Sequence, residues 1–319
     1  FGYWKYLLTL WNFLFYYWIM FSSIKNLFEA LDGAYSANTL RNYQNDYARF
    51  ERFCNAHNRT SIPADEGDVA NYIKYLSSYY RLATIQRNLA AITFVHKYMG
   101  YQDPAKSVLC GIELKRAKRH LTRHQYQAFG ITSDIRDKMI ASCDNTLIGI
   151  RDAALIHFAY DSMCRASELI CAKWNDINST ENGNYTLLIR KSKTDPEGFG
   201  RRVPLTQKCI DRLKEWKSAS KQVEGTIMRN IDRHSNIGDT LTTMSVNRIF
   251  KKRAKLIGID ESDVRYISGH STRVGSAQDL LGKGASLPQI MLAGGWKSTD
   301  MVMKYIEKAD MSFINELRS

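Results

Sequence analysis

The side chains best suited to chemistry lie in one segment near the C-terminal end of the chain. They are a histidine, an arginine, an indole and a phenol: His270, Arg273, Trp296 and Tyr305. Ser271 and Thr272 can cap a helix, so His270 and Arg273 fall at the start of that helix. A cation in the first turn opposes the helix dipole, which favours a bound anion such as phosphate. An isolated His-x-x-Arg pair is more often an exposed surface pair, and only the surrounding residues argue against that.

A second group of candidate residues lies upstream. Arg165 again precedes a predicted helix, and Glu168 lies on the same face and can hold its guanidinium. The simpler alternative for this pair is a local salt bridge. A turn over residues 191–200 carries Lys191 and Lys193, whose pKa neighbouring cations would lower. A lysine there can donate a proton; Lys193 is the first choice and Lys191 the second, and a solvated loop lysine is the alternative.

These residue types suit phosphoryl transfer without a metal. Fixed cations and N–H donors stabilise the charge that grows on the non-bridging oxygens of a five-coordinate phosphorus. A tyrosine can form a covalent intermediate, which conserves the phosphodiester energy for rejoining. The sequence has no carboxylate cluster for two Mg²⁺ ions, no G-x-x-x-x-G-K-[ST] loop and no G-x-G-x-x-G fingerprint. Hydrolytic nucleases and NTPases are therefore disfavoured, and we expect neither a cofactor nor a metal.

Length and charge limit the class of protein to which these residues belong. The 319 residues allow two domains, each with its own core. A formal net charge of +13 indicates a polyanionic partner, either nucleic acid or an anionic membrane surface. The six cysteines are scattered, without C-x-x-C pairs or zinc spacing, which is typical of reduced thiols in a cytosolic protein.

A small all-helical domain is predicted over residues 36–114. Ser36 opens the first helix, two more helices follow Pro63, and a short fourth helix begins at Pro104. Polar side chains able to bind phosphates or read base edges share its outer face: Arg41, Gln44, Arg81, Gln86 and Arg87. An ordinary solvated face is an equally good interpretation of these residues.

The basic run over residues 115–130 is interpreted as the linker between two domains. Runs of this kind are usually solvated. Between two DNA-binding domains, however, its cations would lie along phosphates: Lys115, Arg116 and Arg119.

Residues 131–319 form the second predicted domain, of mixed α+β type. It begins with helices, and the strands 185–190 and 202–205 then form a hairpin. A later helix, 244–256, concentrates cations that we expect to enter a major groove or to line its phosphates: Arg248, Lys251, Lys252, Arg253 and Lys255. An apolar edge near the end of the chain needs a groove to fill, on this chain or on a neighbour: Phe313, Ile314 and Leu317.

Residues 1–35 are treated as a separate apolar segment. From Phe1 to Phe21 nearly every residue is aromatic or aliphatic, which raises the question of a membrane span. No small-residue cleavage site follows, so a secretory signal is disfavoured. A membrane anchor, a partner-binding helix and a segment outside the functional protein remain open. We favour the last two, because nothing downstream needs a membrane.

The order of the candidate residues along the chain is similar to that in the tyrosine site-specific recombinase (phage integrase) family. The resemblance covers the chain from about Ser36 to its C-terminus. Three stretches carry the similarity: Ser-Gly-His-Ser-Thr-Arg-Val-Gly at 268–275, Ile-Met-Leu-Ala-Gly-Gly-Trp at 290–296 and Val-Met-Lys-Tyr-Ile at 302–306. Trp296 stands where many members carry histidine, which favours the Cre-like subgroup. Residues 1–30 have no counterpart in the family.

The resemblance implies a role for each candidate. Tyr305 would attack the scissile phosphate, form a 3′-phosphotyrosine and release a 5′-hydroxyl. The phosphate oxygens would be held by three side chains: Arg165, Arg273 and Trp296. His270 would help to take the tyrosine proton, Lys193 would protonate the leaving oxygen, and Glu168 would orient its neighbours.

The resemblance also implies an architecture and an assembly. The fold would be mainly α, with a helical SAM-like core-binding domain and a mixed α+β catalytic domain that close on DNA as a C-shaped clamp. Four protomers would join two double-stranded target sites with inverted-repeat arms and exchange strands through a Holliday junction. Docking into a neighbour would use Phe313, Ile314 and Leu317. We expect a cytoplasmic, nucleoid-associated protein with no small-molecule substrate and no membrane partner.

Three alternatives stay open at this point. A phage or transposon integrase and a topoisomerase IB-like strand relaxer share the chemistry and differ in whether strands are exchanged between partners. A non-catalytic DNA-binding protein would explain the charge but would leave the histidine, the arginines, the indole and the tyrosine as a coincidence. Neither the target DNA sequence nor the biological role follows from the residues.

Overall fold

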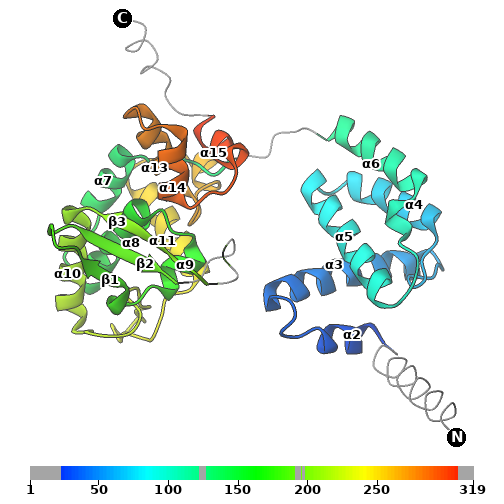
Figure 1. The fold of residues 1–319 in the computed structure, drawn as a ribbon, viewed down its shortest axis with the longest axis horizontal. Helices are drawn as coiled ribbons and strands as arrows, with labels where there is room; N and C mark the ends of the chain where they lie inside the picture. The colour runs from blue at the N-terminus through cyan, green and yellow to red at the C-terminus, as the bar shows by residue number, and fades with distance from the viewer. Residues whose placement is uncertain (1–22, 122–126, 191–194, 196–197, 308–319) are drawn as a thin grey trace, which may run out of the picture. The chain divides into compact units, whose positions relative to one another are not determined.

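The computed structural model describes residues 23–121, 127–190, 195 and 198–307. The chain divides into two units, one ending at His124 and the other beginning at Gln125 (Figure 1). Each unit has a hydrophobic core of its own. Within the described residues, no helix is both long enough and apolar enough to span a bilayer.

The first unit is built from helices, in agreement with the predicted all-helical domain. In chain order these are α2 (Ile24–Ala30), α3 (Ala37–Ala56), α4 (Glu66–Ser77), α5 (Leu82–Tyr98), a 3₁₀ turn (Pro104–Lys106) and α6 (Val108–His120). Ser36 caps α3 as predicted, because its hydroxyl accepts a hydrogen bond from the Thr39 N–H at 3.2 Å. Helix α3 packs on α5, and α4 packs on α6. Aromatic rings fill the space between them, with Phe50 and Tyr72 5.1 Å apart.

Helix α2 belongs to this unit, so the separate segment predicted up to residue 35 is too long. Leu27 and Phe28 are buried in the same core as α3 and α5. The Phe28 ring stacks on Phe94 of α5 with 6.0 Å between their centroids. Ile24 and Leu31 continue the apolar face of Leu27 and Phe28 at helical spacing and pack against the same core. This spacing is typical of an amphipathic helix, but only the tertiary contacts show that the helix is part of the first unit.

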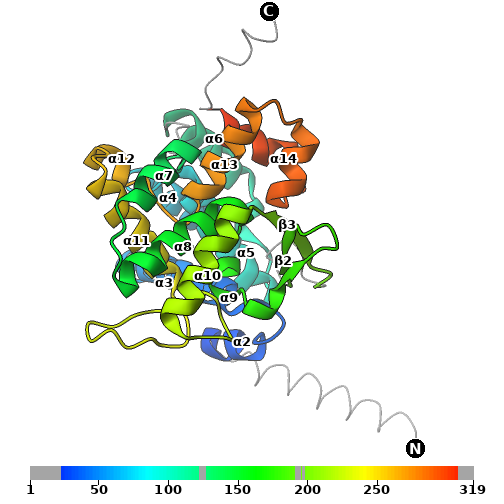
Figure 2. The same ribbon diagram turned by 90° about the vertical axis from the view of Figure 1, so that its left-hand side faces the viewer.

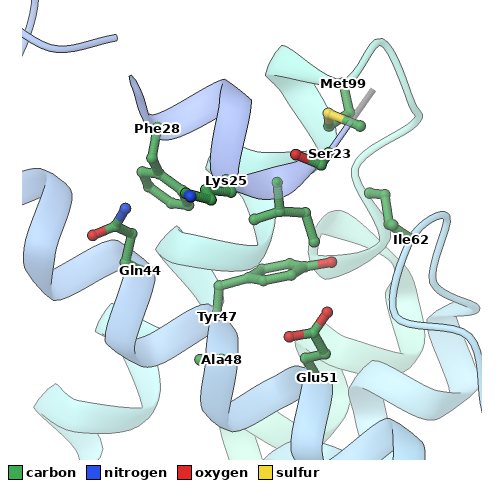
Figure 3. A pocket seen from close by; sticks show the side chains of 10 residues that line it. Ser23, Lys25, Phe28, Gln44, Tyr47, Ala48, Glu51, Ile62 and Met99 are labelled. Carbon is green, nitrogen blue, oxygen red and sulfur yellow. The ribbon is translucent and has the colours of Figure 1, made fainter. Parts of the chain in front are cut away.

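An open groove of about 620 Å³ lies between α2 and α3 (Figure 3). Lys25 of α2 and both Tyr47 and Glu51 of α3 are among its lining residues. The Tyr47 hydroxyl donates a hydrogen bond to the Ser61 carbonyl at 2.9 Å, and burial raises the pKa of Tyr47 to about 12. Since the groove carries charges of both signs, it is not the surface expected for a polyanion.

Helix α6 continues to His120, so residues 115–120 are helical and not part of a linker. Arginine, lysine and alanine are good helix formers, and cations in a last turn interact favourably with the helix dipole. Arg116 also pairs with Glu113 one turn earlier. The cations predicted to follow phosphates are exposed on this helix: Lys115, Arg116 and Arg119.

The second unit combines helices with one small sheet, which confirms the predicted mixed α+β type. Its helices are α7 (Ser133–Ala141), α8 (Leu147–Ser162), α9 (Ala166–Cys171), α10 (Gln207–Ser220), α11 (Thr243–Leu256), α12 (Glu261–Val264), α13 (Ser271–Gly282), α14 (Leu287–Gly294) and α15 (Thr299–Ile306). The antiparallel sheet has the order β1 (Ile177–Ser179), β2 (Tyr185–Ile189), β3 (Arg201–Leu205). The predicted hairpin is β2–β3, with Leu187 opposite Val203. Strand β1 was not predicted.

Helix α8 is the central element of this unit. Helices α7, α10 and α13 pack against it, as does strand β3, and Figure 2 shows the helices around it. Most residues of α8 are buried, including the charged Arg151 and Asp152, which pair with each other at 2.7 Å. At its end, Met163 adopts a left-handed conformation with φ of 47°. This turn directs the chain toward Arg165 and the candidate site.

Candidate active site

Arg165 and Glu168 form the first part of the site, at the start of α9. The Glu168 carboxylate accepts hydrogen bonds from the Arg165 Nη1 at 2.6 Å and from the Arg165 backbone N–H at 3.0 Å. The Glu168 side chain is buried, whereas about a quarter of the Arg165 side chain is exposed. The Arg-x-x-Glu contact predicted from the sequence is therefore confirmed, and Arg165 keeps an accessible guanidinium.

Arg273 forms the second part and is 0% exposed. Its Nη1 donates to the Met163 carbonyl, and its Nη2 donates to the Gly294 carbonyl at 2.9 Å. Its guanidinium lies over the Trp296 ring, 4.8 Å from the centroid. Burial and the nearby Arg165 lower the pKa of Arg273 to about 10, so it is still a cation at neutral pH. Arg273 thus joins the end of α8 to the turn that carries Trp296.

His270 occupies the N-cap position of α13 without a side-chain capping hydrogen bond, whereas Ser271 and Thr272, the predicted caps, lie inside the helix. The Ser271 hydroxyl is used upstream, where it accepts the Ser268 N–H at 3.0 Å. The His270 ring lies 4.9 Å from the Tyr305 ring, between centroids. Burial lowers the pKa of His270 to about 4, and repulsion from Arg273 and Arg165 is a smaller cause of the same shift. The imidazole is therefore neutral at pH 7 and can accept a proton.

Trp296 and Tyr305 complete the group. Gly295 ends α14 in the left-handed region with φ of 64°, and Trp296 follows directly. The Trp296 and Tyr305 rings lie 5.2 Å apart, between centroids. Tyr305 is 9% exposed. Burial raises the pKa of its hydroxyl, although Arg273, Arg165 and a hydrogen bond with Trp296 oppose that shift.

Two glutamines that sequence reasoning did not single out hold the helix of Tyr305. Gln127 Nε2 donates to the Lys304 carbonyl at 2.6 Å and to the Tyr305 carbonyl at 2.8 Å. Gln278 Nε2 of α13 also donates to the Tyr305 carbonyl, at 3.2 Å. The last carbonyls of a helix have no partner within it, and these amides supply one. No local pattern in the sequence marks either glutamine.

Arg201 is a further arginine at the site that the sequence analysis did not identify. Its Nη1 donates to the Ala293 carbonyl at 3.0 Å, and its Nη2 lies 3.8 Å from Glu168 Oε2. Arg201 alternates with Val203 and Leu205, which are buried, so all three share the inward face of β3. That alternation was the signal in the sequence, since a charged residue on an inward face needs a partner there.

Five predicted residues lie outside the described part of the chain. Lys191 and Lys193, the candidate proton donors, come between β2 and β3 in the sequence. The other three form the apolar edge predicted to dock into a neighbour, and they follow α15: Phe313, Ile314 and Leu317.

In the first unit, the predicted DNA-contact residues are all exposed: Arg41, Gln44, Arg81, Gln86 and Arg87. Arg87 is also fixed in place, because its Nη2 donates to Asp46 Oδ1 at 3.0 Å. Asp46 is buried and binds Arg49 at the same distance. A buried carboxylate that orients an exposed guanidinium is suited to a fixed phosphate or base contact.

In α11, Arg248, Lys252 and Lys255 are exposed and Lys251 is half-buried, but Arg253 is 4% exposed. The expectation that Arg253 contacts DNA is therefore wrong for this structure. Arg253 follows Val246, Ile249 and Phe250 at helical spacing and shares their buried face. Its Nη2 donates to Asp152 Oδ2 at 2.7 Å, and its Nη1 donates to the Ser142 carbonyl at 2.9 Å.

Comparison with known proteins agrees with this geometry. Residues 131–311 match the phage integrase family, and residues 24–100 match the N-terminal SAM-like domain of phage integrases. The chain is 28% identical over 275 residues to recombinase Cre of Escherichia phage P1, covering 81% of this chain and 80% of Cre. It is 29% identical over 304 residues to an integrase/recombinase XerD homologue of Selenomonas ruminantium, covering 90% and 86%.

Solved structures share the fold. A complex of the XerH site-specific recombinase with palindromic difH substrate gives a TM-score of 0.60 at 18% identity, covering 88% of this chain and 77% of that one. A lambda integrase dimer bound to a COC′ core site gives 0.57 at 16% identity, covering 89% and 93%. Because the family match alone covers more than half of the residues, the chain belongs to the phage integrase family, the tyrosine recombinases, whose members are DNA strand-transfer enzymes.

Proposed function

We propose that this recombinase cleaves and rejoins DNA at a specific site with Tyr305 as its nucleophile. The tyrosine Oη attacks the phosphorus, the bond to the 5′ oxygen breaks, and a 3′-phosphotyrosine forms as the 5′-hydroxyl leaves. Attack of a 5′-hydroxyl on the phosphotyrosine reverses the step without an external energy source. The observation that supports this most strongly is the contact of the Tyr305 ring with both His270 and Trp296.

His270 accepts the tyrosine proton in this proposal. Its lowered pKa keeps the imidazole neutral, and the raised pKa of Tyr305 keeps the hydroxyl protonated until a base removes the proton. An imidazolium beside Arg165 and Arg273 is unfavourable until a phosphate anion enters between them. Proton transfer is therefore favoured only when DNA occupies the site, which protects the free protein from premature activation.

Arg165, Arg273 and the Trp296 indole N–H are the proposed phosphate ligands. Arg165 is accessible already, because its guanidinium is only partly covered by Glu168. Arg273 and Tyr305 are both buried, and both Nη atoms of Arg273 donate to backbone carbonyls. We therefore infer that phosphate binding is accompanied by a shift of α14 and α15.

Lys193, or failing that Lys191, is the proposed donor of the proton to the leaving 5′ oxygen. The proposal is supported by the strands that flank the turn, because β3 begins at Arg201, and Arg201 Nη2 lies 3.8 Å from Glu168. The base of the turn is therefore beside the candidate phosphate site.

We propose that the two units bind opposite sides of double-stranded DNA with inverted-repeat arms, through the exposed cations described above. Four protomers would then synapse two sites and exchange strands through a Holliday junction. The C-terminal segment would dock on a neighbour through Phe313, Ile314 and Leu317. Leu292 on α14 and Met303 on α15 are exposed apolar side chains that could accept such a segment. We place this activity in the cytoplasm, at the nucleoid.

The test is covalent capture on a nicked substrate. Sites are enriched from a random DNA library by binding and rebuilt as duplexes with a nick a few nucleotides 3′ of each candidate phosphate. The released fragment diffuses away, so a denaturation-resistant protein–DNA adduct accumulates. We expect an adduct with the wild type and with Tyr79→Phe, an exposed tyrosine of the first unit, and none with Tyr305→Phe.

The same assay distinguishes the alternatives. Tight binding of selected sites without an adduct on any of them would contradict the proposal and favour a non-catalytic DNA-binding protein. With an adduct established, a supercoiled plasmid bearing two sites separates the catalytic alternatives. Recombinant products indicate strand exchange, whereas relaxation alone indicates a topoisomerase IB-like relaxer.

A further inference from the structure

Arg201 contacts two parts of the candidate site that come from distant parts of the chain. On one side its Nη1 holds the Ala293 carbonyl in the last turn of α14, at 3.0 Å. On the other side its Nη2 faces Glu168, 3.8 Å away, and has no hydrogen-bond partner among the described residues. Glu168 in turn binds Arg165. Arg201 is therefore the side chain that lies between the Arg165–Glu168 pair and the end of α14.

The end of α14 is held by two arginines. Arg201 takes the Ala293 carbonyl and Arg273 takes the Gly294 carbonyl, the latter at 2.9 Å. These carbonyls belong to the negative end of a helix, where cations are favourable. The guanidinium also lies over the next residue, because a Cβ built on Gly295 would be 2.6 Å from Arg201 Nε. Arg201 thus limits how far the Gly295 turn can move.

That turn sets the position of the nucleophile. Trp296 follows Gly295 directly, and its ring contacts Tyr305 with 5.2 Å between centroids. The turn is tightly packed, because a Cβ added to Gly294 would lie 2.1 Å from the Trp296 ring. A displacement at the Ala293 carbonyl is therefore passed on to the indole and to the tyrosine.

We propose that Arg201 is a positioning residue that fixes the turn carrying Trp296 relative to the Arg165–Glu168 pair. It sets the distance between the phosphate ligands and Tyr305, and it acts through these residues without touching the DNA. The inference rests on the proposed function and extends it to a residue on the strand that borders the proton-donor turn. Its neighbour Arg202 points outward and is exposed, so the two arginines form a matched pair.

The test compares Arg201→Met with Arg202→Met on the nicked substrate at saturating protein. A misplacement of reacting groups by about 1 Å costs roughly 100-fold in rate, so we expect a loss of about that size with Arg201→Met. DNA affinity should stay at the wild-type value. Arg202→Met should cleave at the wild-type rate. Arg201→Lys keeps the charge but cannot span both contacts, and we expect it to recover part of the rate.

A second substrate separates Arg201 from the proton donor. When sulfur replaces the 5′ bridging oxygen, the phosphorus–sulfur bond breaks and the thiolate leaves without needing a proton. Lys193→Ala should recover on this substrate. Arg201→Met should not recover, because the defect lies in the placement of Trp296 and Tyr305. Recovery of Arg201→Met would overturn the proposal and assign Arg201 to the acid turn.

The outcomes distinguish this inference from the proposed function. An adduct that forms equally fast with Arg201→Met and Arg202→Met overturns the role of Arg201 and leaves the function intact. No adduct with the wild type overturns the function itself. If circular dichroism shows that Arg201→Met is unfolded, the cleavage rate of Arg201→Lys is the test. Cleavage by Arg201→Lys at the wild-type rate would contradict the proposal.

Discussion

The side-chain oxygen of Asn247 accepts a hydrogen bond from the Gly269 N–H at 2.6 Å. This bond joins α11, which carries the exposed cations Arg248 and Lys252, to the residue immediately before His270. The helix proposed to contact DNA and the proposed general base are thus connected through one hydrogen bond. Docking of α11 on DNA and placement of His270 are therefore expected to depend on each other.

Replacing Asn247 by leucine tests that connection. The Gly269 N–H would lose its acceptor in a partly buried position, which costs about 1–3 kcal/mol. We expect Asn247→Leu to lower the free energy of unfolding by that amount in urea and to slow adduct formation. Asn247→Asp keeps an acceptor and should retain both. Equal cleavage rates for Asn247→Leu and the wild type would show that the bond does not position His270.

Gly269 is predicted to tolerate no side chain. A Cβ there would lie 2.8 Å from the Cβ of Ala166, the residue after Arg165, and would force the two segments of the site apart. We expect Gly269→Ala to lose roughly 1–3 kcal/mol of stability and most of the cleavage rate. Gly282→Ala is the control, because a Cβ at the end of α13 meets nothing within 4 Å. It should leave cleavage unchanged and gain up to about 1 kcal/mol in a thermal melt. Matching losses in the two variants would contradict the prediction.

Elements with strong local signals were predictable from the sequence. The hydroxyl of Ser36 and the apolar spacing after it predicted the start of α3. Two short runs on either side of a segment with lysines and glycines predicted β2 and β3. Strand β1 is only three residues long and carries no strand signal in its sequence, so it is a strand because it pairs with β2. Helix α2 could not be placed for a similar reason, since its burial depends on contacts with α5.

Residue types and their order along the chain were enough to select the catalytic candidates, but not the residues that hold these candidates in place. The Arg165–Glu168 contact is local and was predicted. Arg201, Gln127 and Gln278 donate to backbone carbonyls more than twenty-five residues away. The alternation around Arg201 indicates only that it faces inward, and no local pattern marks the two glutamines or identifies any of the three partners. Long-range contacts of this kind require the fold to be known.

The low pKa of His270 makes stability depend on pH. Its pKa is about 4 in the folded chain and about 6.5 when unfolded, so between these values the unfolded state binds more protons. Stability must therefore fall as the pH is lowered from about 7 to 4. We expect His270→Gln to remove up to about 3 kcal/mol of that fall, measured by urea unfolding across this range.

His96 and His157 also have lowered pKa values through burial and contribute with the same sign, so a residual slope is expected in the variant. An unchanged slope would show that His270 does not titrate with a depressed pKa.

Neighbouring cations of α11 should have opposite roles. Arg253 holds buried Asp152, so Arg253→Met leaves that carboxylate with Arg151 alone and should cost about 3–5 kcal/mol of stability. Lys252 is exposed, so Lys252→Met should change stability by less than about 0.5 kcal/mol. If Lys252 contacts a phosphate, its removal lowers the salt dependence of DNA binding by about one unit of slope. Urea unfolding and binding at several salt concentrations measure both effects. At a temperature where Arg253→Met stays folded, the salt dependence of its DNA binding should equal that of the wild type. A salt dependence reduced as in Lys252→Met would show that Arg253 contacts DNA after all.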